Sequence, residues 1–79
     1  MTTQQLKEMV DGILGGVELH DDTIYGVVGE GKDHADVALV IGVEQLRGAI
    51  ERRLVTPGYR RLRVMPMSRT VLVEWTREA

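Results

Sequence analysis

The chain has 79 residues, no cysteine and a net charge of −2, and 43 % of its residues are hydrophobic and 28 % charged. These values are typical of a small globular protein, so we expect one domain over residues 1–79 with a single core. The lack of cysteine excludes disulfides, thiolate metal sites and a cysteine nucleophile. A small fold without disulfides fits a reducing compartment, and we expect a cytoplasmic location.

Membrane insertion and secretion are not expected. The longest apolar run, residues 37–43, is much shorter than the roughly 20 residues that a membrane-spanning helix needs. Residues 1–14 alternate polar and apolar side chains and include Asp11, unlike the basic-then-apolar order of a signal peptide.

Charge is divided unevenly along the chain. Residues 1–46 carry two lysines and nine acidic residues, a net charge of −7, whereas residues 47–79 carry eight arginines and three acidic residues, a net charge of +5. This division predicts either a basic surface for an anionic partner or two complementary faces that join copies. The simpler alternative is that the two halves fold against each other and neutralise locally.

The clearest periodic signal lies near the N-terminus. Apolar residues recur there at the spacing of an amphipathic helix: Leu6, Met9, Val10, Ile13 and Leu14. Thr2 and Gln5 fit a capping box, and two glycines follow Leu14. We therefore predict a helix over residues 3–14.

The next segments indicate strands. Residues 17–20 and 23–28 suggest two short strands joined by the acidic turn Asp21-Asp22, and residues 29–35 a polar, glycine-bearing loop. Residues 36–41 are apolar on both faces after the first residue, which is typical of a central or covered strand.

A second helix is expected over residues 43–54. Its inward stripe consists of Val43, Leu46, Ile50 and Leu54. Gly48 inside it lowers helix stability by about 1 kcal/mol relative to alanine, unless something packs closely there. Residues 56–59, Thr-Pro-Gly-Tyr, fit a type II turn.

Two further strands complete the chain. The first covers residues 61–65 and ends at Pro66, which predicts an edge or bulged strand. Ser68-Arg69 would form the turn into a last strand over residues 70–76. The predicted fold is α+β: helix, two or three strands, helix, two strands, with the helices packed on one face of a mainly antiparallel sheet.

The histidines suggest one metal hypothesis. His20 precedes two aspartates and His34 lies between Asp33 and Asp36, so both groups together would offer ligands for a divalent cation if they converged. The spacing matches no compact metal motif, and aspartate is common in turns for backbone reasons. We therefore expect solvated turns and no metal.

Other catalytic patterns are weak. Residues 29–32, Gly-Glu-Gly-Lys, do not form a Walker loop, because Asp33 follows the lysine before another strand. Ser68 is the only serine and has no histidine near it in sequence. We expect no enzyme and no cofactor.

The arginines around the end of the second helix raise a nucleic-acid alternative. Guanidinium groups bind phosphates, and Tyr59 or Trp75 could stack on bases. The element order is similar to that of double-stranded RNA-binding domains. The lysine cluster that such domains place at the start of the second helix is absent, and Glu44 stands there instead.

Residues 42–56, from Gly-Val-Glu-Gln-Leu-Arg through Ile50 and Leu54 to Thr56, resemble a helix of the small baseplate-wedge proteins of contractile phage tails. That family usually continues with a Gly-x-x-x-x-x-x-Tyr-Gly segment. Here Pro57-Gly58 turns directly into Tyr59.

These observations favour a non-enzymatic protein–protein interaction or assembly module, a regulator, an inhibitor or a structural subunit, with an arginine-rich and an acidic face. The expected partner is another protein or a second copy in a homo-oligomer. The alternative is a nucleic-acid-binding domain that contacts phosphates through the arginines of residues 52–69. The predicted partner-binding residues are Arg52, Arg53, Tyr59, Arg60, Arg61, Arg63, Met65, Met67, Arg69 and Leu72.

Overall fold

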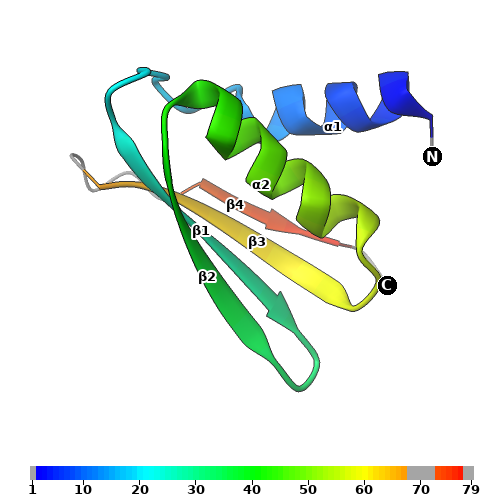
Figure 1. Ribbon diagram of the computed structural model, residues 1–79. Helices are drawn as coiled ribbons and strands as arrows, with labels where there is room; N and C mark the ends of the chain where they lie inside the picture. Colours follow the sequence, from blue (N-terminus) through cyan, green and yellow to red (C-terminus); the bar gives the residue numbers. More distant parts are fainter. Residues whose placement is uncertain (1, 68–72, 78–79) are drawn as a thin grey trace.

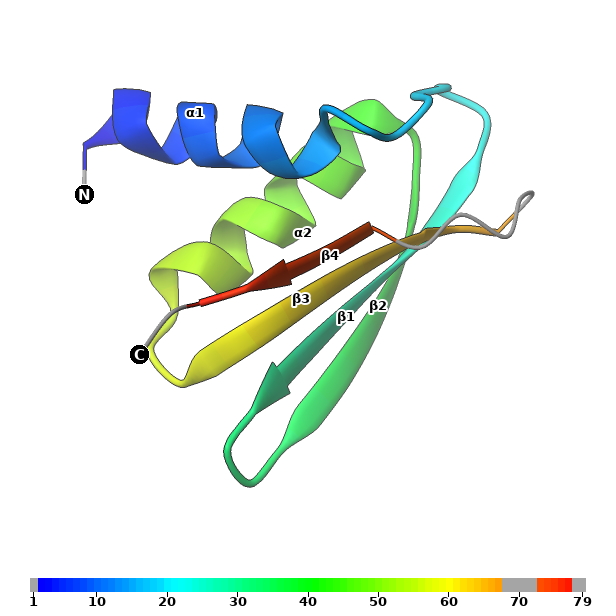
Figure 2. The same cartoon turned by 180° about the vertical axis from the view of Figure 1, so that it is seen from behind.

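The computed structural model describes residues 2–67 and 73–77. Two helices cover one face of a four-stranded sheet, and the other face has no covering layer in this part of the chain (Figure 1, Figure 2). The elements are α1 (Thr3–Leu14), β1 (Ile24–Gly31), β2 (Ala35–Ile41), α2 (Val43–Val55), β3 (Tyr59–Pro66) and β4 (Val73–Thr76). The strand order is β2-β1-β3-β4 and every pairing is antiparallel, so the α+β prediction is confirmed.

Helix α1 has the predicted bounds and the predicted N-terminal cap. The backbone N–H of Gln5 donates to Thr2 Oγ1 at 3.1 Å, and the N–H of Thr2 donates to Gln5 Oε1 at 2.9 Å. These reciprocal bonds satisfy two backbone donors that a helix start leaves without an intrahelical partner. Helix α2 ends before the predicted turn, where Gly58 has the positive φ of 103° that a type II turn requires.

The core lies between the helices and one face of the sheet. Its buried members are Val10, Ile13, Leu14, Val17, Tyr25, Val27, Leu46, Ala49, Ile50, Leu54, Leu62 and Val64. Successive side chains of a strand point to opposite faces. Because Tyr25 and Val27 point toward the helices, Ile24 and Val28 lie on the opposite face.

Residues 17–20 do not form the predicted strand. The hydroxyl of Tyr25 takes the place of a strand partner: it accepts a hydrogen bond from the N–H of His20 at 2.8 Å and lies 3.2 Å from the carbonyl of Glu18. A buried phenol needs such partners. This segment therefore leads α1 to β1 as an extended connection, and the first sheet pair is β1 with β2.

The predicted loop over residues 29–35 is shorter than expected, because β1 continues to Gly31 and β2 begins at Ala35. The N–H of Gly31 donates to the carbonyl of His34 at 2.7 Å and closes the hairpin. Of the two alternatives predicted for the strand that ends at Pro66, the edge strand is wrong, because β3 lies between β1 and β4. The register between β1 and β3 does shift at Glu30 and Gly31, as expected of a bulged strand. Pro66 is the last residue of β3, so its missing N–H interrupts none of the described pairs between β3 and β4, which end at Val64 and Val73.

Strand β2 is the largest departure. The apolar pattern of residues 36–41 predicted a central or covered strand, but β2 is an edge strand that pairs with β1 alone. Val37 and Leu39 on it are 64 % and 68 % exposed. Within the described residues the odd-numbered side chains of β2 therefore have no covering layer, whereas Val40 on the other face packs against the core.

Two glycines give a paired test of local packing. A Cβ at Gly48 in α2 would meet no atom within 4 Å, whereas a Cβ at Gly29 would lie 2.6 Å from Tyr59 Cε1. We expect Gly48→Ala to raise the free energy of unfolding by about 0.5–1 kcal/mol through helix propensity. Gly29→Ala should lower it by about 1–3 kcal/mol through overpacking. Urea unfolding followed by circular dichroism measures both, and equal effects of the two variants would contradict the packing described.

Candidate functional site

The face of the sheet opposite the helices carries most of the exposed apolar surface. Of the eight large hydrophobic side chains that are exposed in the described residues, six lie on this face: Ile24, Val37, Leu39, Ile41, Met65 and Met67. We call these six side chains the open-face patch. Exposed apolar residues scattered singly are ordinary, but a contiguous group on one face marks a contact surface.

Gly26 forms the floor of the open-face patch. A Cβ on Gly26 would lie 3.7 Å from Met67 Sδ and 3.8 Å from Leu39 Cδ2. Side chains from both neighbours of β1 therefore meet above this glycine. Methionine is flexible and polarisable, which suits a surface that adapts to a partner.

A row of charges occupies the other end of the same face. Glu30 on β1 lies 3.6 Å from Arg61 Nη1 and 3.5 Å from Arg63 Nε, both on β3. Arg61 also pairs with Glu74 on β4. These four side chains, each about one-third exposed, form an ionic row across three strands. Exposed pairs of this kind stabilise a fold by about 0.2–1 kcal/mol each.

A second polar cluster lies on the helix side of the sheet. Arg53 of α2 donates from Nε to Asp36 Oδ1 at 2.9 Å and from Nη1 to the carbonyl of Ala49 at 3.1 Å. The Tyr59 hydroxyl donates to Asp36 Oδ2. The Tyr59 ring lies against Gly29, which leaves no room for a side chain there. This cluster joins α2, β2 and β3 around one carboxylate.

The hydrogen bonds and charges around Asp36 shift the pKa of two side chains, Asp36 and Tyr59. Burial raises the pKa of Asp36, but hydrogen bonds from Tyr59 and Arg53 and the positive charge of Arg53 outweigh it, so the pKa lies below its ordinary value. The hydrogen bond to Asp36, together with burial and the Asp36 charge, raises the pKa of Tyr59. Asp36 is therefore an anion at neutral pH, and Tyr59 keeps its proton.

The structure divides the predicted partner-binding residues between two faces. Arg61, Arg63, Met65 and Met67 lie on the open face, whereas Arg53 and Tyr59 belong to the cluster around Asp36. Arg52 and Arg60 are exposed. Arg69 and Leu72, with the predicted turn at Ser68, lie outside the described residues.

Sequence reasoning missed most of the open-face patch. Val37, Leu39 and Ile41 were not among the predicted partner-binding residues, because residues 36–41 were expected to form a central or covered strand. Ile24 on β1 was not among them either. The available signal was that residues 37 to 41 are apolar at both odd and even positions. That pattern predicts cover on both faces, and the chain itself supplies cover on one.

The two histidine groups do not converge. His20 precedes the end of β1 where Ile24 pairs with Ile41, and His34 lies in the hairpin turn at the other end. The length of β1 separates them. Within residues 2–67 and 73–77, no group of three or more His, Cys, Asp or Glu side chains is arranged to hold a metal ion. No helix in the same part of the chain is long and apolar enough to cross a membrane.

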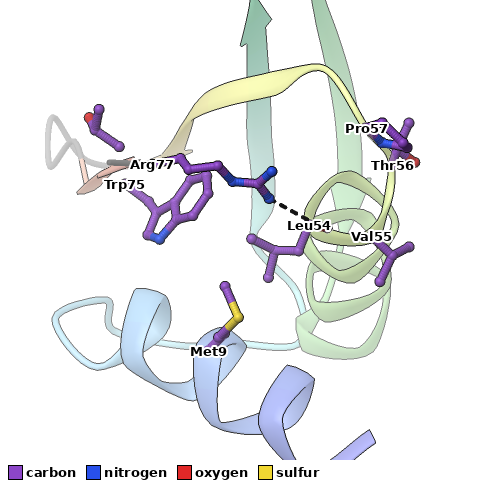
Figure 3. A pocket seen from close by; sticks show the side chains of 8 residues that line it. Met9, Leu54, Val55, Thr56, Pro57, Trp75 and Arg77 are labelled. Atoms are coloured by element: carbon purple, nitrogen blue, oxygen red, sulfur yellow. Dashed lines mark hydrogen bonds between the residues drawn. The ribbon is translucent and has the colours of Figure 1, made fainter. Parts of the chain in front are cut away.

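An open groove of about 760 Å³ lies where the end of α2 approaches β4. Met9 and Trp75 line it from α1 and β4, and Arg77 extends across it to donate to the Leu54 carbonyl at 3.3 Å (Figure 3). The guanidinium of Arg77 also lies 5.5 Å from the Trp75 ring centroid. Arg77 is the one charged side chain among the described residues that line the groove, and its bond to a carbonyl at the C-terminal end of α2 is a structural role.

Comparison of the chain with protein-family models, with curated proteins and with solved structures gives no match in any of the three. The functional argument therefore depends on the geometry of the chain itself.

The pKa of Asp36 leads to a pH-dependent prediction. A carboxylate whose pKa is lower in the folded state stabilises the fold above its unfolded pKa, near 3.8, and that stabilisation is lost as the pH falls through the folded pKa. We expect Asp36→Asn to lower the free energy of unfolding by about 1 kcal/mol at pH 7. The difference from the parent chain should shrink below about pH 4.

Denaturant unfolding between pH 2.5 and 7 measures this difference. The exposed Asp33→Asn is the matched control and should change stability by less than about 0.5 kcal/mol. An Asp36→Asn deficit that stays constant down to pH 2.5 would contradict the assignment.

Proposed function

We propose that this protein is a non-enzymatic interaction or assembly module that binds another protein, or its own copies, through the open-face patch. One observation carries the proposal: six of the eight exposed large hydrophobic side chains in the described residues lie on the face of the sheet that the helices leave uncovered. The expected compartment is the cytoplasm, on the grounds of the cysteine-free sequence.

The arrangement of the face supports this role. Protein interfaces combine an apolar centre with a polar rim, and arginine is enriched in them. The patch supplies the apolar centre over β2, β1 and the end of β3, and Arg61 and Arg63 with their carboxylate partners border it. Methionines at positions 65 and 67 allow that centre to adapt to its partner.

Charged side chains contribute less to the proposed interface than their distribution along the sequence suggests. Arg47 pairs with Asp11 at 2.7 Å, Arg53 with Asp36 at 2.8 Å, and Arg61 with Glu30. Each pair joins an arginine of the basic half to an acid of the other half. Such local neutralisation favours an interface whose affinity comes from apolar contact, with charges that set orientation.

The nucleic-acid alternative receives less support from the same contacts. Arg53, Arg61 and Arg63 already bind carboxylates, and a phosphate would have to compete with those partners. Arg52 and Arg60 are exposed, but they lie on α2 and β3, outside the ionic row. Nucleic acid remains the competing proposal that the experiment below must separate.

Site-specific photo-crosslinking in living cells tests the proposal. A benzophenone amino acid replaces Ile24 in the open-face patch, and the matched control carries it at the exposed Glu8 of α1. We expect discrete protein adducts from position 24 and none of the same mass from position 8. Adding Met67→Glu to the position-24 chain should lower the adduct yield at least about tenfold, because a buried unpaired charge costs more than 1.4 kcal/mol.

Two outcomes would contradict the proposal. Equal adduct patterns from positions 24 and 8 would mean that the patch is not a specific contact surface. Adducts that disappear on nuclease treatment would favour the phosphate-binding alternative, in which binding also weakens steeply with salt.

A further inference from the structure

Strand β2 leaves one edge of the sheet without a neighbour. It pairs with β1 on one side, and no described element lies along its other side in either view (Figure 1, Figure 2). Its seven residues are long for an edge strand, and proteins normally protect such edges with charges, proline or a covering loop. Asp36 is the one charged residue of β2 and is bound by Arg53 on the helix side, and residues 37–41 contain no charge and no proline.

The backbone groups that face this edge follow from the pairing with β1. The N–H of Gly42 donates to the carbonyl of Thr23, and the carbonyl of His34 accepts from Gly31, so even-numbered residues of β2 bond to β1. Odd-numbered residues therefore direct their N–H and C=O groups outward. Gln45 confirms the direction, because its side chain accepts from the N–H of Ile41 at 3.1 Å.

The geometry points to a second copy of this chain as the missing neighbour. We propose that two copies pair antiparallel along β2 about a two-fold axis at Val37, so that the two sheets join into one. In this register Val37 lies opposite its own counterpart and Leu39 lies opposite Ala35 of the other copy. The register uses the outward groups of residues 35, 37 and 39 and leaves the Gln45 cap on Ile41 intact.

Registers with the axis closer to Ile41 are less favourable for a physical reason. A two-fold axis at residue 38 or 39 would place Ile41 within the new ladder, and its N–H would have to exchange the Gln45 oxygen for a strand partner. An axis at Val37 requires no such exchange. A perpendicular two-fold axis also makes the contact self-complementary and closed.

Charge complementarity supports a copy of this chain over an unrelated strand. Antiparallel pairing at Val37 sets Asp36 of each copy opposite Ala38 of the other, on the helix side of the joined sheet. Ala38 borders a groove between β2 and α2 that Arg52 and Arg53 also line. Asp36 is already bound by Arg53 and Tyr59 of its own copy. Arg52 has no ion pair within residues 2–67 and 73–77, so Arg52 of each copy can add a further positive charge beside the Asp36 of the other.

The sequence of β2 gives a third, independent argument. An apolar strand that does not alternate in hydrophobicity is typical of a central strand with cover on both faces. Pairing with a second copy makes β2 a central strand, and its odd-numbered side chains stay on the uncovered face. Small chains bury a low fraction of their surface alone, so a shared sheet also offsets a limitation of length.

This inference concerns the backbone edge of β2 and deepens the proposed function by naming one partner, a second copy. It rests on the proposed interaction role but not on the apolar contact of the open-face patch. Val37 also belongs to the open-face patch, so Met67→Lys tests the open face alone, whereas charge pairing and crosslinking at position 37 identify the edge contact.

Light scattering on a sizing column, at several concentrations of the full chain, gives the first test. We expect twice the monomer mass of 8.8 kDa. Val37→Lys should return the chain to monomer, because two like charges would lie directly opposite each other at the axis. Met67→Lys, at a comparably exposed position of the open face, should leave the dimer intact.

Charge pairing and a disulfide test the register. Mixing Val37→Lys with Val37→Glu chains should restore the dimer. Leu39→Lys alone should already form the dimer, since Leu39 does not face its own counterpart. In this cysteine-free chain, Val37→Cys should crosslink on mild oxidation, because facing residues in such a pair lie about 5.5 Å apart. Leu39→Cys should crosslink at least tenfold more slowly.

The outcomes separate this inference from the proposed function. A monomer at all concentrations, with position-24 adducts to another protein still formed in cells, overturns the β2 pairing and leaves the open-face role standing. A dimer that Met67→Lys breaks and Val37→Lys does not would overturn it in favour of contact between open faces. Fast crosslinking of Leu39→Cys would overturn the register.

Discussion

The central position of β1 is the constraint on which the rest of the structure depends. It pairs with β2 on one side and β3 on the other, so its two-residue alternation sets the facing of both neighbours. Because Tyr25 and Val27 point into the core under α2, the registers place Leu39 and Met65 beside Gly26 on the opposite face. A slip by one residue would exchange the two faces. The buried core therefore also determines which side chains form the exposed apolar patch.

The sequence predicted correctly those features of the fold that depend on interactions within a few residues. The capping box at Thr2 fixed the start of α1, and the steric demand of a type II turn located Gly58, because both effects act within a few residues. The errors concern long-range partners. Residues 17–20 have strand-like composition, yet the N–H of His20 and the carbonyl of Glu18 bond to the Tyr25 hydroxyl and not to a strand. The edge position of β2 depends on where β3 pairs, which no feature within β2 specifies.

The candidate site was predicted in part for the same reason: Met65 and Met67 were identified from their own strand, and Val37 and Leu39 were not.

The fold brings the acidic and the basic half of the sequence into contact. Arg47, Arg53 and Arg61 come from the basic half, and each meets a carboxylate from the acidic half, Asp11, Asp36 or Glu30. Antiparallel hairpins and a helix that returns over the sheet bring the halves together, so charges far apart in sequence become neighbours. Exposed pairs contribute little stability individually. Because these pairs neutralise opposite charges locally, the exposed apolar side chains are the most distinctive feature of the protein surface.

A small protein with helices on only one side of its sheet leaves the other face of the sheet exposed to water. A sheet has two faces and two edges, whereas this chain covers one face with α1 and α2. The remaining apolar surface is exposed on the uncovered face and along β2, and the hydrophobic effect favours any partner that removes it from water. Pairing along β2 completes the edge but leaves the open face of both copies on the same side of a wider sheet. The two contacts are therefore compatible: a dimer joined through β2 would present a doubled and continuous apolar face to a further partner, with the ionic rows of Glu30, Arg61 and Arg63 bordering it.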